Sequence, residues 1–136
     1  MNATDPRIDR LVGMLDDLEA DVDETIDLAD ELAATEDRSL LPGLEAGLDH
    51  ALRERNSYAR EVLGGVIGTI GGPETLPLLV RASAVDLGDD QDGLATEIAD
   101  LVAAEPKKAR TLLQPLVMDD DLTVANRAEW ALRFAG

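Results

Sequence analysis

The residues that could take part in catalysis are the many carboxylates and a single histidine. Asp and Glu together number 29 in a chain of 136 residues, and His50 is the only imidazole. General acid–base catalysis needs such a group desolvated in a pocket, within reach of a reacting atom. No motif places a serine, a second histidine or one particular carboxylate beside His50, so His50 is interpreted as a solvent-facing helix residue. The sequence predicts no catalytic residues and a protein that is not an enzyme.

The glycine-rich run at residues 64–72 has the look of a phosphate-binding loop. Such a loop requires a preceding strand and a lysine directly after its last glycine. No strand is predicted before the run, and no lysine follows it, because the only lysines are Lys107 and Lys108. Close helix packing followed by a glycine stop explains the run better.

The aspartates of residues 86–93 suggest a calcium loop. An EF-hand needs a glycine at its sixth position and a glutamate at its twelfth. Placing Asp86 first and Glu97 twelfth loses the glycine, and placing Gly93 sixth leaves two ligand positions without oxygen side chains. We therefore expect a capping turn in which Asp92 caps a helix beginning at Gly93, and we expect neither a metal nor another cofactor.

Trp130, the only tryptophan, has two interpretations. It can cover the open C-terminal end of the core. Alternatively, it can be a binding residue, because exposed Trp residues dominate interaction hot spots and an aromatic ring among carboxylates holds Arg or Lys by cation–π contact. The sequence leaves both interpretations open.

The chain is strongly acidic, with a formal net charge of −17 and only 12 Lys and Arg residues. Such a charge repels phosphate groups, so direct binding to nucleic acid or to an anionic membrane is not expected. It attracts basic proteins; alternatively, it serves solubility or adaptation to salt. No signal peptide and no membrane-spanning run is recognisable, so a cytoplasmic location is expected.

The composition indicates an all-α fold. Aromatic residues make up 2% and cysteine is absent, so the core must consist of Leu, Val, Ile and Ala, which suits helices. Near the N-terminus apolar residues recur at helical spacing. They are Ile8, Leu11, Val12, Leu15 and Leu18, followed by Val22, Ile26, Ala29 and Leu32. This pattern predicts two helices that meet near residues 19–23, with Thr4 as the first N-cap, although one long helix is an alternative.

From residue 37 onward the pattern repeats as three pairs of helices. The first helices of the pairs are expected at Ser39 to about Leu52, Pro73 to about Val85 and Pro106 to about Met118. The second helices are expected at Ser57 to about Ile70, Gly93 to about Ala104 and Leu122 to about Ala135. The segment beginning Leu41-Pro42 recurs as Leu76-Pro77, at an interval of 35 residues.

The run from Ala59 to Leu79 resembles the junction between two repeats of the HEAT-like (HEAT/armadillo-type) family. It has a helix with small residues inside, a Leu-Gly-x-Ile-Gly-type ending, a short turn and then Leu-Pro. The segment from Leu116 to Val124 resembles the usual Asp-rich turn. The match is diverged, because the Arg expected early in each second helix is present as Arg60 but replaced by Ala95 and Ala125.

This resemblance implies a short right-handed α-solenoid of antiparallel helix pairs, with seven or eight helices in one domain spanning residues 1–136. Residues 1–36 would form an N-terminal helical cap. Residues 37–72, 73–105 and 106–136 would form the repeats. In this family the exposed side of the second helices lines a concave surface. The partner-binding residues implied by that surface and by the acidic turns are Glu61, Asp100, Asn126, Trp130, Asp89, Asp90, Asp92, Asp119 and Asp120.

The function expected from these observations is a non-catalytic protein–protein interaction module. An acidic solenoid would bind a basic protein partner, as an immunity-type inhibitor or an adaptor does. One alternative is a structural or assembly protein whose acidity serves solubility or salt adaptation. A second alternative, of lower weight, is an enzyme or nucleic-acid protein of HEAT type, which would need a basic groove.

Overall fold

The computed structural model describes residues 5–87 and 94–136, and every regular element within them is a helix. The predicted all-α class is therefore confirmed. The chain divides into two compact units, which we call unit 1 (Met1–Gly71) and unit 2 (Gly72–Gly136). The division falls within one residue of the end of the predicted repeat 37–72.

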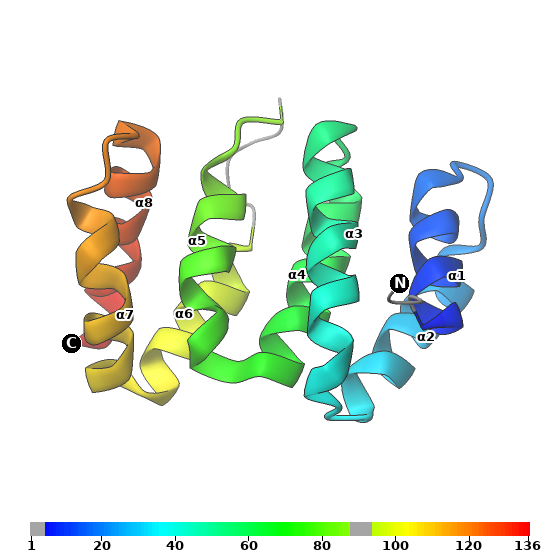
Figure 1. Ribbon diagram of the computed structural model, residues 1–136, viewed down its shortest axis with the longest axis horizontal. Helices are drawn as coiled ribbons and strands as arrows, with labels where there is room; N and C mark the ends of the chain where they lie inside the picture. Colours follow the sequence, from blue (N-terminus) through cyan, green and yellow to red (C-terminus); the bar gives the residue numbers. More distant parts are fainter. Residues whose placement is uncertain (1–4, 88–93) are drawn as a thin grey trace. The chain divides into compact units, whose positions relative to one another are not determined.

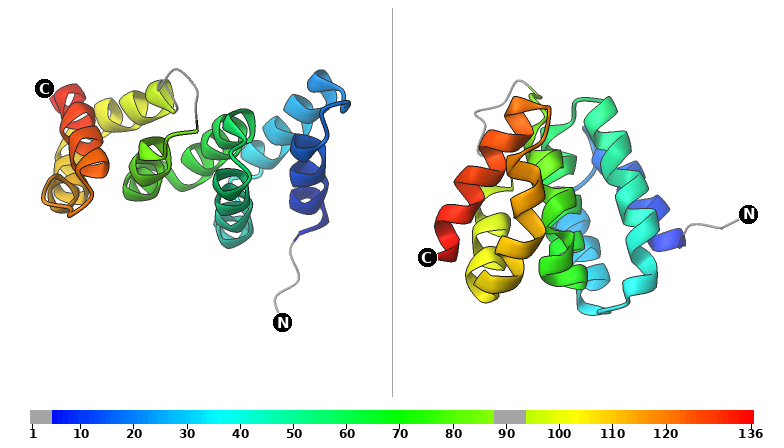
Figure 2. Two further views of the ribbon diagram at one scale, coloured as in Figure 1. Left: turned by 90° about the horizontal axis from the view of Figure 1, so that it is seen from above. Right: turned by 60° about the vertical axis from the view of Figure 1, so that its left-hand side comes forward.

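The described part of unit 1, residues 5–71, contains four α-helices and one short 3₁₀-helix. The elements are α1 (Pro6–Asp16), α2 (Val22–Ala34), η1 (Arg38–Leu40), α3 (Leu41–Arg53) and α4 (Ser57–Gly71). Figures 1 and 2 show α1 and α3 in one layer of the unit and α2 and α4 in the other, and α2 contacts α4 directly. The two helices predicted before residue 36 are confirmed. The predicted cap Thr4 lies outside the described residues, and the N-cap of α1 is Asp5, whose side chain accepts the hydrogen bond from the Arg7 backbone N–H.

Only some of the regularly spaced apolar residues near the N-terminus are buried in the core. Ile8, Leu11 and Leu15 are buried as predicted, whereas α1 ends at Asp16 and leaves Leu18 fully exposed. Helix α2 buries a different face, consisting of Thr25, Leu28, Ala29 and Leu32. Val22 and Ile26 share the helical spacing of this segment but lie off the buried face and are exposed.

The core of unit 1 is closed by α3 and α4. Leu44, Leu48 and Ile67 are completely buried, and burial of one such side chain contributes about 1.5–3 kcal/mol. Gly47 lets α3 approach α1, because a Cβ at this position would lie 3.0 Å from Val12 Cγ2.

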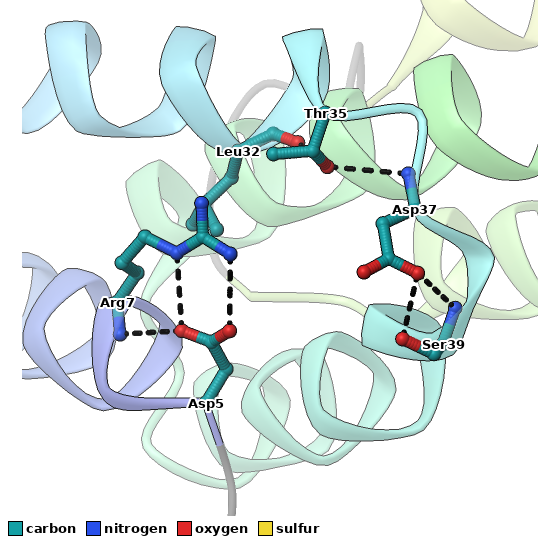
Figure 3. A network of polar contacts seen from close by, with 6 residues as sticks. All are labelled: Asp5, Arg7, Leu32, Thr35, Asp37 and Ser39. Carbon is teal, nitrogen blue, oxygen red and sulfur yellow. Dashed lines mark hydrogen bonds and ion pairs between the residues drawn. The ribbon is translucent and has the colours of Figure 1, made fainter.

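Two separate sets of local polar contacts, one at the start of α1 and one at and just after the end of α2, lie near each other (Figure 3). The guanidinium of Arg7 donates to both carboxylate oxygens of Asp5, over 3.2 and 3.1 Å. The Thr35 hydroxyl donates to the Leu32 carbonyl and accepts from the Asp37 N–H, and the Asp37 carboxylate accepts from Ser39. These bonds cap the ends of the helices in the manner expected of Asp, Ser and Thr.

In residues 72–87 and 94–136, unit 2 contains four further α-helices. Its elements are η2 (Gly72–Thr75), α5 (Leu76–Ala84), α6 (Ala95–Ala104), α7 (Pro106–Val117), α8 (Leu122–Leu132) and η3 (Arg133–Ala135). In Figures 1 and 2, α5 and α7 form one layer of this unit and α6 and α8 the other. Leu76, Leu79, Ile98 and Leu113 are completely buried.

Several helix ends in unit 2 differ from the prediction. The helix expected from Pro73 begins within the 3₁₀-helix η2, whose first residue, Gly72, has a φ of +69°, a conformation that glycine adopts without strain. The helix expected from Gly93 begins at Ala95, preceded by Leu94 with φ of +59°. The predicted cap Asp92 lies outside the described residues. The last helix is α-helical to Leu132 and then 3₁₀.

One helical stretch among the described residues, Ser57–Ala84, is apolar and long enough to cross a membrane by length and composition. Of its most apolar 18-residue window, 56% is buried inside the protein. Core helices of water-soluble proteins pass the same test, so this stretch alone is weak evidence for a membrane span.

Candidate functional site

A groove of about 850 Å³ opens in unit 1 where the α1–α2 turn lies beside the α3–α4 turn. Its apolar lining includes Met14, Leu18, Val22 and Tyr58. Its charged lining includes Asp16, Asp17, His50, Glu54 and Arg55. A recess of this size with apolar walls and a polar rim can hold part of a ligand or of a partner protein.

The first wall of the groove is the turn between α1 and α2. The Asp17 carboxylate accepts from the Glu19 N–H over 2.9 Å, which folds the chain back directly after α1. Asp21 then caps α2 by accepting from the Glu24 N–H over 3.2 Å. These two aspartates fix the turn so that Leu18 lies at its tip.

The second wall is the turn between α3 and α4, and Asn56 joins it to the first. The Asn56 side-chain amide donates to the Leu15 carbonyl at the end of α1 over 3.0 Å, and its Oδ1 accepts from the Ala59 N–H at the start of α4. Helix α3 ends with the Asn56 N–H bonded to the Ala51 carbonyl, and Arg55 has a left-handed φ of +58°. This is a Schellman ending with Arg55 at the position that usually favours glycine.

His50 has a charged neighbour that the sequence did not indicate. Its Nε2 lies 2.8 Å from Asp16 Oδ2, and both side chains are partly exposed. The two residues are 34 positions apart, so no local motif could reveal the contact. The interpretation of His50 as a simple solvent-facing residue is therefore corrected: it pairs α3 with the end of α1 at the rim of the groove.

Carboxylates are concentrated beside this groove. Residues 16–24 contain six acidic residues and no basic one, and residues 5–37 contain thirteen acidic residues and two arginines. Residues 38–71 contain four of each sign. Among the described residues of unit 1, no ion pair joins a carboxylate of α2 to a basic side chain. The net negative charge of unit 1 thus lies within residues 5–37, which include α1, α2 and the turn between them.

Trp130 lies in unit 2 and is only half exposed. The Arg127 guanidinium carbon stands 3.9 Å from the centroid of the Trp130 ring, and Phe134 meets Trp130 edge to face with centroids 5.1 Å apart. Arg127 is held in place because its Nε donates to Ser83 Oγ over 3.0 Å. One face of the indole therefore already carries a cation from the same chain, and a partner's Arg or Lys would have to use the other face or displace Arg127.

The remaining predicted site residues are dispersed. Asn126 and Asp100 are exposed in unit 2, whereas Glu61 is exposed in unit 1, where its Oε1 lies 3.9 Å from Nε of the buried Arg60. Asp120 is exposed on the α7–α8 turn. The predicted residues Asp89, Asp90 and Asp92 lie outside the described part of the chain.

Two carboxyl groups of unit 2 have shifted pKa values. Burial, followed by the charge of Asp100, raises the pKa of Glu97. The pKa of Asp119 is lowered mainly by the hydrogen bond from the Asp121 N–H, and the guanidinium of Arg81 adds to the effect at 2.9 Å. The Asp119 carboxylate is therefore already hydrogen-bonded and ion-paired within unit 2.

The described residues hold no cluster of three or more His, Cys, Asp or Glu side chains arranged to bind a metal ion. Sequence reasoning missed the groove residues Leu18, Val22, Tyr58, Asp16 and His50. A signal was present in the leucine at position 18, which is surrounded by acidic residues at a place where two helices were expected to meet.

Comparisons with protein-family models, with curated proteins and with solved structures found no match to this chain.

Proposed function

We propose that this protein is a non-catalytic interaction module that binds a basic protein partner through the acidic surface of unit 1. We include in the proposal a fold of the HEAT-like type, a short right-handed solenoid of antiparallel helix pairs. The two-layered packing of four helices in each unit supports this fold. Stacked helix pairs are a common basis for extended binding surfaces.

The observation that carries the proposed function is the one-sided charge of unit 1. Six carboxylates occupy residues 16–24 without a basic residue among them. Like charges held this close repel one another and destabilise the folded chain unless a partner or counterions neutralise them. A basic partner supplies that neutralisation and is steered toward this surface from a distance.

The same charge disfavours other classes of partner. Phosphate backbones and anionic lipid headgroups carry the sign that this surface repels. Inhibitors and adaptors that recognise basic proteins need a surface of this sign, so a basic enzyme or toxin, or a basic subunit of an assembly, is the partner class that we propose.

Affinity capture from the native host at low ionic strength tests this function. Immobilised protein is compared with immobilised polyglutamate of similar charge, which controls for unspecific ion exchange. We expect a basic protein that is retained by the immobilised protein but not by polyglutamate. It should be released by about 0.5 M NaCl, where charges are strongly screened. If the proteins retained are the same as on polyglutamate, or are not basic, the charge serves solubility or assembly and the proposed function is wrong.

A further inference from the structure

The groove of unit 1 presents large apolar side chains that the fold leaves in water. Leu18 is 100% exposed, Val22 60% and Tyr58 42%, and all three line the groove. Their apolar surface is gathered between two turns that are tied together by the hydrogen bond from Asn56 to the Leu15 carbonyl. Contiguous exposed apolar surface with a polar rim is typical of a protein-binding site.

The fold of unit 1 does not depend on the side chains of Leu18 and Val22. Leu18 is completely exposed at the tip of a turn whose conformation is set by Asp17 and Asp21. Val22 is the first residue of α2 and lies off the buried face of that helix. A polar residue would serve equally well at both positions as far as folding is concerned.

We infer that this groove is the docking site for an amphipathic basic segment of the partner protein. A bulky apolar side chain of the segment enters between Leu18, Val22 and Tyr58. Arginines or lysines on either side of it meet carboxylates at the rim, among them Asp17 and Glu54. The inference rests on the proposed function and gives it a site and a recognition chemistry.

Charge complementarity selects this occupant over the others. A second copy of the chain would bring the same acidic turn, with the same six carboxylates in residues 16–24, against the groove. An anionic membrane would be repelled in the same way. A basic segment without apolar residues would leave Leu18 and Val22 in water, and an uncharged apolar segment would leave the carboxylates unpaired, so the segment must have both properties.

Unit 2 offers a closely matched control. Met118 and Leu122 are also four residues apart, and Leu122 also begins a helix directly after a capping aspartate, Asp121. Their exposures are 82% and 74%, yet neither lines the groove. The double variant Leu18→Ser/Val22→Ser can therefore be compared with Met118→Ser/Leu122→Ser, after circular dichroism has shown that both variants are folded.

The probe is a fluorescein-labelled synthetic helix with leucines on one face and lysines on the other, titrated at low ionic strength and followed by anisotropy. A second peptide has serine in place of each leucine. For the wild type we expect the leucine–lysine peptide to bind at least about tenfold more tightly than the serine–lysine peptide. We expect Leu18→Ser/Val22→Ser to abolish most of that difference, and Met118→Ser/Leu122→Ser to leave it within about threefold.

The outcomes separate the two proposals. The groove is not the site if both peptides bind the wild type equally, or if the groove variant binds as the wild type does. In either case, salt-sensitive binding of the peptides would still support the proposed function. If neither peptide binds the wild type, both proposals fail. If the wild type forms a dimer in sedimentation experiments that the groove variant does not form, the occupant is a second copy and this inference is overturned.

Discussion

The α1–α2 turn of unit 1 and the α7–α8 turn of unit 2 are built alike but are surrounded differently. Both contain two exposed apolar residues four positions apart, with a capping aspartate directly before the second. In unit 2 the turn carboxylate of Asp119 is bonded to Arg81 and is only 19% exposed. In unit 1 the groove-lining Asp16 is 42% exposed, and among the described ion pairs its only partner is His50.

This difference teaches that a local motif does not by itself determine an interaction site. At the α7–α8 turn of unit 2 the carboxylate of Asp119 is contacted by Arg81, while Arg127 of the same unit contacts Trp130 and Arg110 donates to the Ala135 carbonyl. In unit 1 the acidic turn faces a groove with apolar walls instead. Unit 1 thus has exposed carboxylates and exposed apolar side chains at the same turn.

The largest expected effect comes from neutralising the acidic turn of unit 1. The combined variant Asp17→Asn, Glu19→Gln, Asp23→Asn and Glu24→Gln keeps the Asp21 cap and the acceptor oxygen at position 17. We expect it to weaken binding of the leucine–lysine peptide about 10- to 100-fold at low salt, because local complementary charge is lost.

A matched variant separates local charge from net charge. Asp100→Asn, Glu105→Gln, Asp120→Asn and Glu129→Gln remove the same number of charges from exposed positions of unit 2. We expect binding within about threefold of the wild type. Equal losses in the two variants would mean that only net charge matters and would remove the distinction between the turns.

Removal of the caps tests whether the two turns are locally equivalent. Asp21 accepts from the Glu24 N–H and Asp121 accepts from the Thr123 N–H over 2.9 Å. We expect Asp21→Ala and Asp121→Ala each to lower the free energy of unfolding by about 1 kcal/mol, measured by urea denaturation. A loss at only one of the two turns would show that they are not built alike.

A substitution at Arg55, in the second wall of the groove, should have a smaller effect of opposite sign, because it should tighten peptide binding. Arg55 occupies a left-handed backbone conformation and adds a positive charge to the groove. Arg55→Gly should raise the free energy of unfolding by about 0.5–1 kcal/mol. It should also tighten peptide binding about two- to fivefold by removing a like charge. Weaker binding of a stabilised Arg55→Gly variant would place the peptide elsewhere.

The most subtle contrast is in the dependence of stability on pH. The pKa of Asp119 is lowered in the folded protein by the Asp121 N–H and by Arg81. The ionised Asp119 therefore stabilises the fold above its unfolded pKa, and this contribution is lost as the pH falls through its folded pKa. We expect Asp119→Asn to show a shallower loss of stability between about pH 5 and pH 2 than the wild type, measured by denaturation at several pH values. The neighbouring exposed Asp120→Asn serves as the control.

The helices could be predicted from the sequence, whereas the groove could not. Apolar spacing and Pro42, Pro77 and Pro106 near helix starts gave the order of the helices. The same spacing cannot distinguish an α-helical turn from a 3₁₀ turn, which is why η2 and η3 were assigned to longer helices.

Leu18, Val22 and Ile26 continue the helical period of Leu11 and Leu15 in the sequence, yet all three are exposed. The turn formed by Asp17 and Asp21 instead breaks that period. The contacts that build the groove, from Asp16 to His50 and from Leu15 to Asn56, join residues 34 and 41 positions apart. No local pattern encodes such contacts.

The most direct test of the account is to map the peptide on the protein by NMR. Amide resonances of the full-length, isotope-labelled chain are followed while the leucine–lysine peptide is added at low salt. The account predicts that the perturbed amides are those of residues 14–26 and 50–58, while those of residues 118–135 stay unchanged. Perturbation centred on Trp130, or on Met118 and Leu122, would contradict the account and place the binding surface in unit 2.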